Sequence, residues 1–303
     1  MAIQYIPYKQ IDKTKWDACI SSATNGLIYA YTYYLDAMAK NWDALVQGDY
    51  EAVMPLTWNR KYNIYYLYQP PFTACLGVFG NLLTPETINK FLKAVPPKFK
   101  YWDIYFNSGN LYKLEGFEMY QRMNYVLSLN ESYENLYNAY RQNIKRNIKK
   151  SEQFQLSMCK NIAIADIINL AKEQAGNFSS ITADDFNRFE KLFQLLHKNQ
   201  QAVTYAVHTK NGQLIASAAF FFSHHRVYYI LVGNHPDGKT LGASHALINA
   251  FIKDHAGKEL LLDFEGSDIP SLAFFYSSFG AVEEKYSGIK LNRLPAAIKW
   301  LKK

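Results

Sequence analysis

The chain has little cysteine, and it lacks long apolar runs. Its 303 residues include only three cysteines, Cys19, Cys75 and Cys159. An odd and scattered set of this kind excludes a disulfide framework and a Cys-x-x-Cys metal site, and it favours a reducing, cytoplasmic location. The longest apolar run, residues 214–223, is much shorter than the ~18 residues that a membrane-spanning helix needs, so we expect no membrane span.

Aromatic and basic residues are in excess. The sequence holds 24 Tyr, 19 Phe and 5 Trp, and its 33 Lys and Arg against 26 Asp and Glu give a formal net charge of +7. Because 49% of the residues are hydrophobic and only 19% are charged, a disordered chain is excluded. The length predicts about two domains, and the charge favours an anionic partner.

Two segments with the same pattern lie far apart in the sequence. Residues 48–70 and 212–236 each contain two apolar, β-rich runs around a polar turn, which we place at residues 59–61 and 223–226. Two such runs joined by a short polar turn predict a β-hairpin. The sequence therefore predicts one hairpin in each half of the chain.

The features that follow each hairpin are repeated as well. Helical patterns contain the similar motifs INKFLK, from Ile88, and INAFIK, from Ile248. A short apolar strand with an aspartate follows each helix, with Asp103 in the first half and Asp263 in the second. This order predicts two copies of one α/β unit. The expected divisions are an N-terminal domain over residues 1–130, a basic linker helix over 131–154 and a C-terminal domain over 155–303.

The linker helix is expected to be amphipathic. Apolar residues between Tyr133 and Ile148 recur at spacings of three and four, which predicts one buried stripe. Arg141, Lys145 and Arg146 lie beside this stripe and are candidates for binding a phosphate-bearing acceptor, such as a nucleotide-linked sugar, or RNA. A solvated helix face explains the same residues, and nothing in the sequence indicates DNA binding. A second, short helix is expected over residues 294–303.

A strand, a loop of small residues and a helix follow one another in the second half. The loop covers residues 234–244, and its Gly238 and Gly242 have no side chains to block a ligand. The start of a helix presents unpaired backbone N–H groups to a phosphate. An ordinary loop with turn glycines has the same sequence features, so the pattern leaves both interpretations open.

Two motifs resemble the GNAT acyltransferase superfamily. The segment KTLGAS, from Lys239 to Ser244, is similar to the R/Q-x-x-G-x-G/A loop that binds coenzyme A in that family. The segment AFFYSSFGA, from Ala273, is similar to the family's later A-x-x-F-Y-x-x-x-G-F helix. The resemblance implies acyl-CoA as the donor substrate, Tyr276 as the general acid for the leaving thiolate, and contacts to the donor from Leu231, Val232, Gly233, Lys239, Gly242, Ala243 and Ser244.

Over nearly the whole chain, the order of motifs resembles the Fem family of aminoacyl-tRNA-dependent peptidyltransferases and their BioF2-like acetyltransferase relatives. The supporting segments are Trp16-Asp17 with Met54-Pro55-Leu56, Arg141–Arg146, and Asp263–Ser267. Fem-like sequences commonly have Lys where this chain has Tyr276, and no heptad-rich arm follows Lys150. The resemblance implies an α/β (α+β) fold with two tandem GNAT-like domains, each a mixed, mostly antiparallel sheet flanked by helices.

Acyl transfer to an amine needs a group that removes a proton from the amine. Asp263 and Glu265 are the candidates, because they end a predicted strand and alternation places them on one face. A buried Asp263, a surface Glu265 and a core Tyr276 would explain the same positions without catalysis. His and Cys do not occur at ligand spacing, so we expect no metal.

The sequence therefore predicts an N-acyltransferase that moves an acyl or aminoacyl group to an amine, with acyl-CoA bound in the C-terminal half. One alternative is a Fem-type transferase that uses aminoacyl-tRNA and acts on a cell-wall precursor. The other is a tandem GNAT module that binds ligands without catalysis. The oligomeric state stays open.

Overall fold

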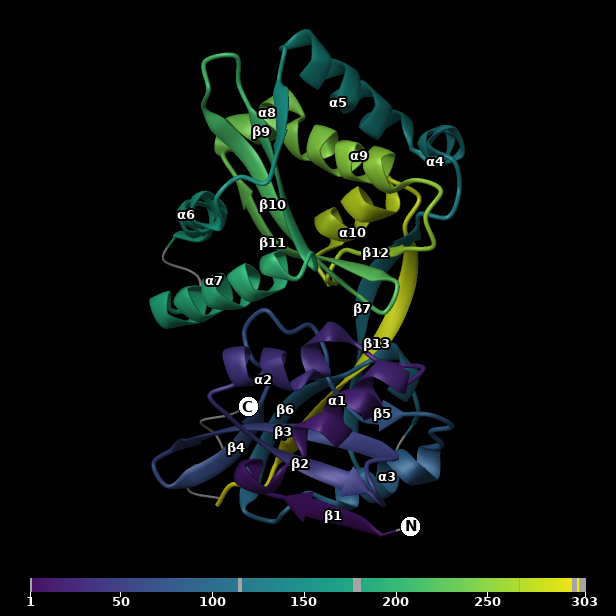
Figure 1. Cartoon of the computed structure of the whole chain (residues 1–303), viewed down its shortest axis with the longest axis vertical. Helices are drawn as coiled ribbons and strands as arrows, with labels where there is room; N and C mark the ends of the chain where they lie inside the picture. The colour runs from purple at the N-terminus through teal and green to yellow at the C-terminus, as the bar shows by residue number, and fades with distance from the viewer. Residues whose placement is uncertain (1, 114–115, 177–180, 267, 296–298, 300–303) are drawn as a thin grey trace. The chain divides into compact units, whose positions relative to one another are not determined.

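The computed structural model describes residues 2–113, 116–176, 181–266, 268–295 and 299. The chain divides into two compact units (Figure 1): unit 1 contains residues 1–122 and 285–303, and unit 2 contains residues 123–284. Ser267, from the Fem-like motif, and residues 296–298 and 300–303, from the expected C-terminal helix, lie outside the described residues.

Unit 1 is built on a sheet with the strand order β1-β2-β3-β4-β6-β13. Neighbouring strands are antiparallel except β4 and β6, which are parallel. The strands are β1 (Ile3–Ile6), β2 (Asn41–Gln47), β3 (Ala52–Lys61), β4 (Ile64–Tyr68), β6 (Phe99–Phe106) and β13 (Val282–Asn292), and the short β5 (Phe79–Gly80) pairs with β3. The helices are α1 (Lys13–Ser22), α2 (Thr32–Met38) and α3 (Pro85–Ala94), with short 3₁₀ turns η1 (Tyr8–Gln10), η2 (Ile28–Ala30) and η3 (Ser108–Asn110).

Local sequence signals explain helix α3 and the β3–β4 hairpin. Thr84 caps α3, because its side chain accepts a hydrogen bond from the Thr87 N–H, and Pro85 occupies the first helical position. The hairpin turn lies at Tyr62 and Asn63, which have φ values of 49° and 61°. The turn expected at residues 59–61 was therefore placed too early, because strand β3 continues through Lys61.

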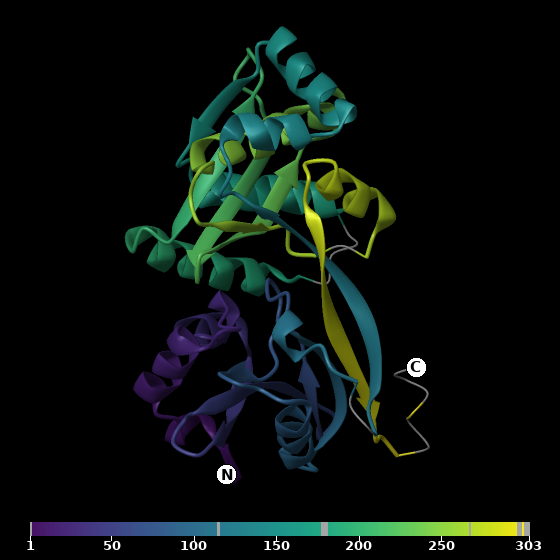
Figure 2. The same ribbon diagram turned by 90° about the vertical axis from the view of Figure 1, so that its right-hand side faces the viewer.

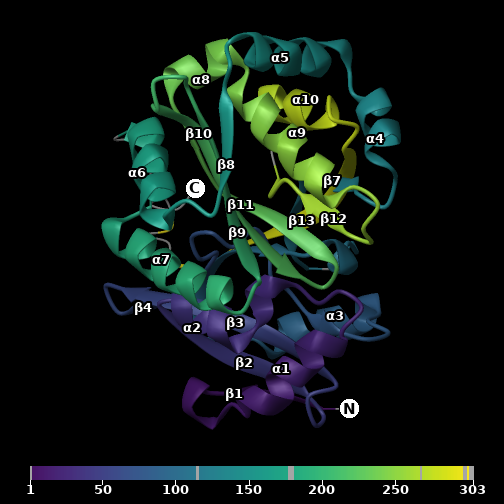
Figure 3. The ribbon, with the colours of Figure 1, turned by 45° about the horizontal axis from the view of Figure 1, so that its top comes forward.

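Unit 2 has the strand order β7-β12-β11-β10-β9-β8, with β11 and β12 parallel and the other described pairs antiparallel. Helices α6 and α7 cover one face of its sheet and α9 covers the other (Figure 3). The strands are β7 (Glu118–Ser128), β8 (Ser157–Lys160), β9 (Ala202–His208), β10 (Leu214–Ser223), β11 (Arg226–Asn234) and β12 (Leu261–Asp263). The helices are α4 (Tyr133–Ala139), α5 (Gln142–Gln153), α6 (Ile164–Ala175), α7 (Ala183–Lys198), α8 (Pro236–Leu241), α9 (Ala243–His255) and α10 (Pro270–Ser277).

The two units share one topology. In each, four strands succeed one another as antiparallel neighbours, a helix follows, and the next strand pairs in parallel with the fourth. Asp103 pairs with Tyr68 in unit 1, and Asp263 pairs with Tyr228 in unit 2, each at the last pair of the parallel register. The expected fold class, two tandem GNAT-like domains with mixed sheets, is confirmed.

The final strand of each half of the sequence completes the sheet of the other half. Residues 126–128 of β7 pair with β12, and residues 287–292 of β13 pair with β6. The units therefore differ from the expected boundaries at residues 130 and 155, because residues 287–292 of β13 pair with β6 of unit 1. Sequence order alone contains no information about this exchange.

The expected linker helix is two helices, α4 and α5, and both belong to unit 2. The helical path is interrupted at Tyr140 and Arg141, which have extended backbone angles. The Arg141 N–H donates to the Ser278 carbonyl at 2.9 Å instead of to its own helix. The expected apolar stripe is nevertheless packed in the core of unit 2, where Tyr140, Ile144 and Ile148 are buried.

The exchange of the last strands makes a testable prediction for Ile289. This residue of β13 is fully buried in the core of unit 1, so Ile289→Ala is expected to destabilise unit 1 by about 2 to 5 kcal/mol. Tryptophan fluorescence during urea unfolding reports on unit 1, because residues 123–284 contain no Trp. Lys285→Ala, at an exposed position of the same strand within unit 1, is the control. Equal effects of the two substitutions would contradict the assignment.

Candidate functional site

Strand β11 carries a bulge where the candidate site begins. Ala219 of β10 pairs with Leu231 and Phe220 pairs with Tyr229, so Ile230 is an extra residue in β11. On its other side, β11 pairs with β12 only from Arg226 to Tyr228. The stretch with Leu231, Val232 and Gly233 lies beyond this pairing, and its edge on that side has no β12 partner among the described residues.

Asp263 is held in a buried group of charges at the base of these strands. One of its oxygens accepts from the Arg226 guanidinium at 2.5 Å, and the other accepts from the Asn124 amide at 2.8 Å. Arg226 also donates to Glu284 at 2.7 and 2.9 Å. The carboxylates of Asp263 and Glu284 raise the pKa of Arg226, although burial acts against its charge. The four residues come from four strands, β7, β11, β12 and β13.

The alternation predicted that Glu265 and Asp263 share one strand face, and this prediction is wrong. Strand β12 ends at Asp263, and Glu265 has a left-handed backbone with a φ of 66°. Its backbone N–H donates to an Asp263 oxygen at 2.8 Å. Alternation applies only within a strand, so the two carboxylates are placed by a turn instead.

Tyr276 lies on α10 in an aromatic group, and it is 8% exposed. Its ring stacks on Phe264 with a centroid distance of 4.5 Å, and it lies 6.5 Å from the ring of Tyr125. Burial, together with the charge of Glu265, raises the pKa of Tyr276 to about 12. The phenol therefore keeps its proton at neutral pH. Tyr229, which contacts Phe264 edge-on, also has a pKa raised well above its usual value by burial.

The segment expected to be a small-residue loop is largely helical. Residues 236–241 form α8, and Gly242, with a φ of 75°, links it to α9. A Cβ on Gly238 would lie 2.2 Å from the Ile215 carbonyl oxygen, and a Cβ on Gly242 would lie 2.5 Å from the Asn147 carbonyl oxygen. Both glycines are thus required by backbone packing against β10 and α5.

The other residues of this segment have mixed surroundings. Gly233 packs against the α6 backbone, where a Cβ would lie 2.9 Å from the Ala171 nitrogen. The Ser244 hydroxyl donates to Asn234 at 2.6 Å. Ala243 is buried, whereas Lys239 is exposed on α8. Of the residues expected to contact the donor, Lys239 and the backbone edge of residues 231–233 are the ones that packing within the protein leaves available to a ligand.

The basic candidates lie at the start of α5. The Arg141 guanidinium lies 5.1 Å from the centre of the Phe274 ring. The Lys145 ammonium donates to the Asn138 carbonyl at 3.0 Å and lies over the Tyr137 ring, while Arg146 is exposed. None of the three forms an ion pair with a described carboxylate.

Sequence reasoning missed His245 and the Arg226 group. His245, in the first turn of α9, contacts the Phe275 ring edge-on at 5.0 Å, and its buried Nδ1 has no hydrogen-bond partner among the described residues. Burial lowers the pKa of His245 to about 4. No sequence signal distinguishes this histidine from the others. The match between Arg226 and two carboxylates depends on strands that are distant in sequence.

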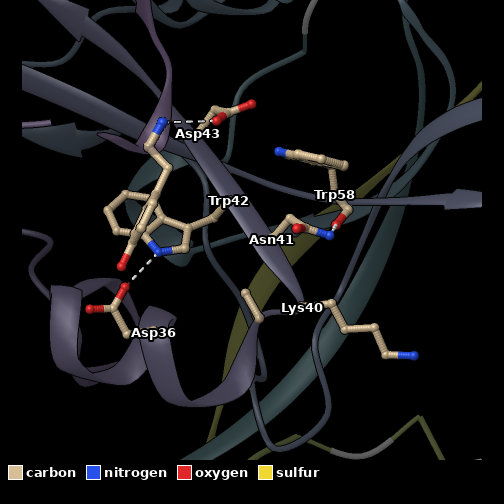
Figure 4. Close-up of a pocket in the computed structure, with 8 residues that line it drawn as sticks. Asp36, Lys40, Asn41, Trp42, Asp43 and Trp58 are labelled. Atoms are coloured by element: carbon tan, nitrogen blue, oxygen red, sulfur yellow. Dashed lines mark hydrogen bonds between the residues drawn. The ribbon is translucent and has the colours of Figure 1, made fainter. Parts of the chain in front are cut away.

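A separate cavity of about 250 Å³ lies in unit 1 (Figure 4). Asp43 is fixed at this cavity by the Tyr5 hydroxyl and the Tyr8 N–H, at 2.6 and 2.9 Å. The buried indole N–H of Trp58 has no partner among the described residues. Aromatic rings and two carboxylates line the cavity, and its residues were not singled out from the sequence. The lining residues are Tyr8, Asp36, Ala39, Lys40, Asn41, Trp42, Asp43 and Trp58.

The described part of the chain contains neither a metal-binding group of side chains nor a membrane-spanning helix. Its His, Cys, Asp and Glu side chains form no group of three or more that could hold a metal ion. Within the same residues, no helix is both long and apolar enough to cross a membrane.

Comparisons with known proteins agree with this geometry. Residues 138–268 match the family described as acetyltransferase (GNAT) domain. The match lies within unit 2 and includes the bulge, the start of α9, Asp263 and Glu265, but it ends before Tyr276. No curated protein sequence matches the chain.

Three solved structures share the fold over almost the whole chain. FemX has a TM-score of 0.66 at 15% identity, with 100% of both chains covered. A conserved protein of unknown function from Bacteroides thetaiotaomicron has a TM-score of 0.62 at 13% identity, covering 94% of this chain and 99% of that one. L-PGS from Bacillus licheniformis has a TM-score of 0.56 at 10% identity, covering 96% and 95%. Residues 138–268 therefore match a GNAT domain, the whole chain shares the fold of FemX, and the resemblance expected from the sequence is confirmed.

The surroundings of His245 predict a pH dependence of stability. The pKa falls from 6.5 to about 4 on folding, so between these values the unfolded state binds a proton that the folded state does not. The free energy of unfolding is therefore expected to have its highest value above pH 6.5. It should decrease by a few kcal/mol as the pH falls to about 4. His245→Gln should reduce this loss in urea titrations, whereas His235→Gln, at a partly exposed site, should not. A loss of the same size in wild type and His245→Gln would rule out His245 as its source.

Proposed function

We propose that the chain is an N-acyltransferase that transfers an acyl or aminoacyl group to an amine, and that its chemistry takes place in unit 2. One observation carries the proposal: strand β11 has a bulge, and its pairing with β12 ends beside the buried Tyr276. Those backbone N–H groups of residues 231–233 that point away from β10 would polarise the acyl carbonyl on the free strand edge.

In the proposed reaction, the amine nitrogen attacks the acyl carbon. A C–N bond forms, and the bond to the leaving sulfur or oxygen breaks. Tyr276 would donate its phenolic proton to that leaving atom, and its raised pKa of about 12 keeps the proton available at neutral pH. The proton lost by the amine passes to a carboxylate, and the phenol regains a proton from water as product leaves.

We assign the carboxylate role to Glu265 rather than to Asp263. Both oxygens of Asp263 already accept hydrogen bonds, from Arg226, Asn124 and the Glu265 backbone. A substrate amine would have to compete with these bonds. Asp263 is then a positioning residue that fixes the turn carrying Glu265.

The donor is proposed to be acyl-CoA, which supplies an activated thioester when bound. The free edge of β11 fits its acyl arm. The expected phosphate loop fits less well, because Gly242 is packed against the Asn147 carbonyl of α5. Lys239 remains exposed beside it and would contact the phosphates.

The packing of Gly242 against α5 favours a second candidate function. A Fem-type transferase would take its aminoacyl group from tRNA and needs no coenzyme A loop. Arg141, Lys145 and Arg146 would then contact an anionic substrate, either tRNA or a nucleotide-linked cell-wall precursor. A module that binds such ligands without catalysis is the third possibility, and turnover assays separate it from both.

Donor binding tests the first function directly. Isothermal titration with acetyl-CoA should give saturable heat, and Lys239→Glu should weaken binding through charge repulsion. Lys198→Glu, an exposed charge change on α7, is the matched control. No heat with acetyl-CoA, together with salt-dependent binding of aminoacylated tRNA, would replace the first function by the second.

Tyr276→Phe tests the proposed general acid. Removing the phenolic proton is expected to lower kcat by about 10²-fold or more, with little change in KM, because the hydroxyl acts mainly in the transition state. Tyr140→Phe is a suitable control, since the buried Tyr140 hydroxyl has no partner among the described residues. Unchanged turnover in Tyr276→Phe would remove this residue from the mechanism.

A further inference from the structure

Helix α10 is almost entirely apolar, yet much of it is exposed. Its sequence is PSLAFFYS, in which Leu272 is 39% exposed and Phe274 is 54% exposed, and the preceding Ile269 is 57% exposed. Figure 2 shows α10, in yellow, at the edge of unit 2 with no helix or strand outside it in that view. Large apolar side chains gathered on one short exposed helix mark a site of interaction.

Basic side chains lie directly beside this helix. The Arg141 guanidinium covers the Phe274 ring at 5.1 Å, and the Arg141 N–H donates to the Ser278 carbonyl at the end of α10. Helix α5 continues from there with Lys145 and the exposed Lys149. Residues 141–150 carry five positive charges and no negative one, and none of the five is paired with a carboxylate in the part of the chain that the structure describes.

We propose that α10 and the start of α5 form a docking surface for an anionic lipid membrane. Phe274 would enter the boundary between headgroups and acyl chains, and Arg141, Lys145 and Lys149 would meet the lipid phosphates. The surface lies on the membrane and does not span it.

The combination of the two kinds of side chain favours lipid over nucleic acid. The phosphates of an RNA would satisfy the basic residues, but they would leave the aliphatic Ile269 in water. A bilayer with anionic headgroups offers a partner to both kinds of side chain. Charge complementarity and apolar exposure therefore indicate an anionic membrane as the partner of this surface.

Docking does not depend on the proposed transferase activity. Tyr276 is buried on the same helix that exposes Phe274. A docked α10 would bring the candidate site close to the lipid headgroups, so an acceptor amine carried by a lipid would be within its reach. Membrane binding can nevertheless be measured without any turnover, and the two proposals can fail separately.

Co-sedimentation with vesicles tests the docking surface in the full-length protein. We expect binding to vesicles of phosphatidylcholine with phosphatidylglycerol, weak binding to phosphatidylcholine alone, and a decrease as salt is raised. Phe274→Ser should weaken binding about tenfold or more by removing apolar area. Lys149→Glu should weaken it through charge. Leu195→Ser, at a position 45% exposed on α7, should leave binding unchanged.

Other outcomes would overturn the proposal. Equal binding to both kinds of vesicle, or binding that Phe274→Ser and Lys149→Glu leave unchanged, would exclude this surface. Concentration-dependent dimers that Phe274→Ser abolishes, without vesicle binding, would make the face an interface between copies of the chain. Binding of tRNA without binding of vesicles would assign the basic residues to nucleic acid. Thermal melting of each variant checks folding, and the salt dependence of the wild-type protein tests the charge contribution without any substitution.

Discussion

The buried charge of Arg226 is the constraint on which the candidate site depends. A guanidinium that is largely removed from water must be neutralised, and here Asp263 and Glu284 both do so. Because Asn124 binds the same two carboxylates, strands β7, β11, β12 and β13 are fixed to one another. Removing one partner of such a group leaves a buried charge unpaired, which typically costs about 3 to 5 kcal/mol. The position where β11 leaves β12 is therefore set by electrostatics as well as by strand pairing.

Above this charged base, the site changes to aromatic packing. Phe264 contacts both Tyr229 and Tyr276, and burial raises the pKa values of the two tyrosines. A charged group fixes the turn at Asp263, and an apolar group keeps Tyr276 protonated. The separation of these roles supports assigning Glu265, between them in sequence, to proton transfer. It also explains why an aspartate that looked catalytic in the sequence is better understood as a positioning residue.

Most of the local structure followed from short patterns. Thr84 and Pro85 explain the start of α3, and the turn expected at residues 223–226 was confirmed between β10 and β11. Predictions failed where a neighbour distant in sequence decides the conformation. The linker helix breaks at Arg141 because that N–H bonds to Ser278, and the expected loop is helical where Gly238 packs on the Ile215 carbonyl. Asp263 at the end of a strand and Tyr276 on a helix were predicted, whereas Glu265 lies in a turn beyond the strand. The roles of all three residues remain proposals.

The sequence by itself determined the repeated order of hairpin, helix and strand, because apolar periodicity and capping are local properties. It also determined that residues 141–150 carry five positive charges and no negative one. Only the tertiary structure decided that the final strands are exchanged, since backbone hydrogen bonding between β13 and β6 has no signature in residue order. Likewise, the pairing of Arg226 with Asp263 and Glu284 and the exposure of Phe274 arise from contacts between distant segments. Burial and electrostatic pairing are properties of the assembled fold, so no local pattern could assign them.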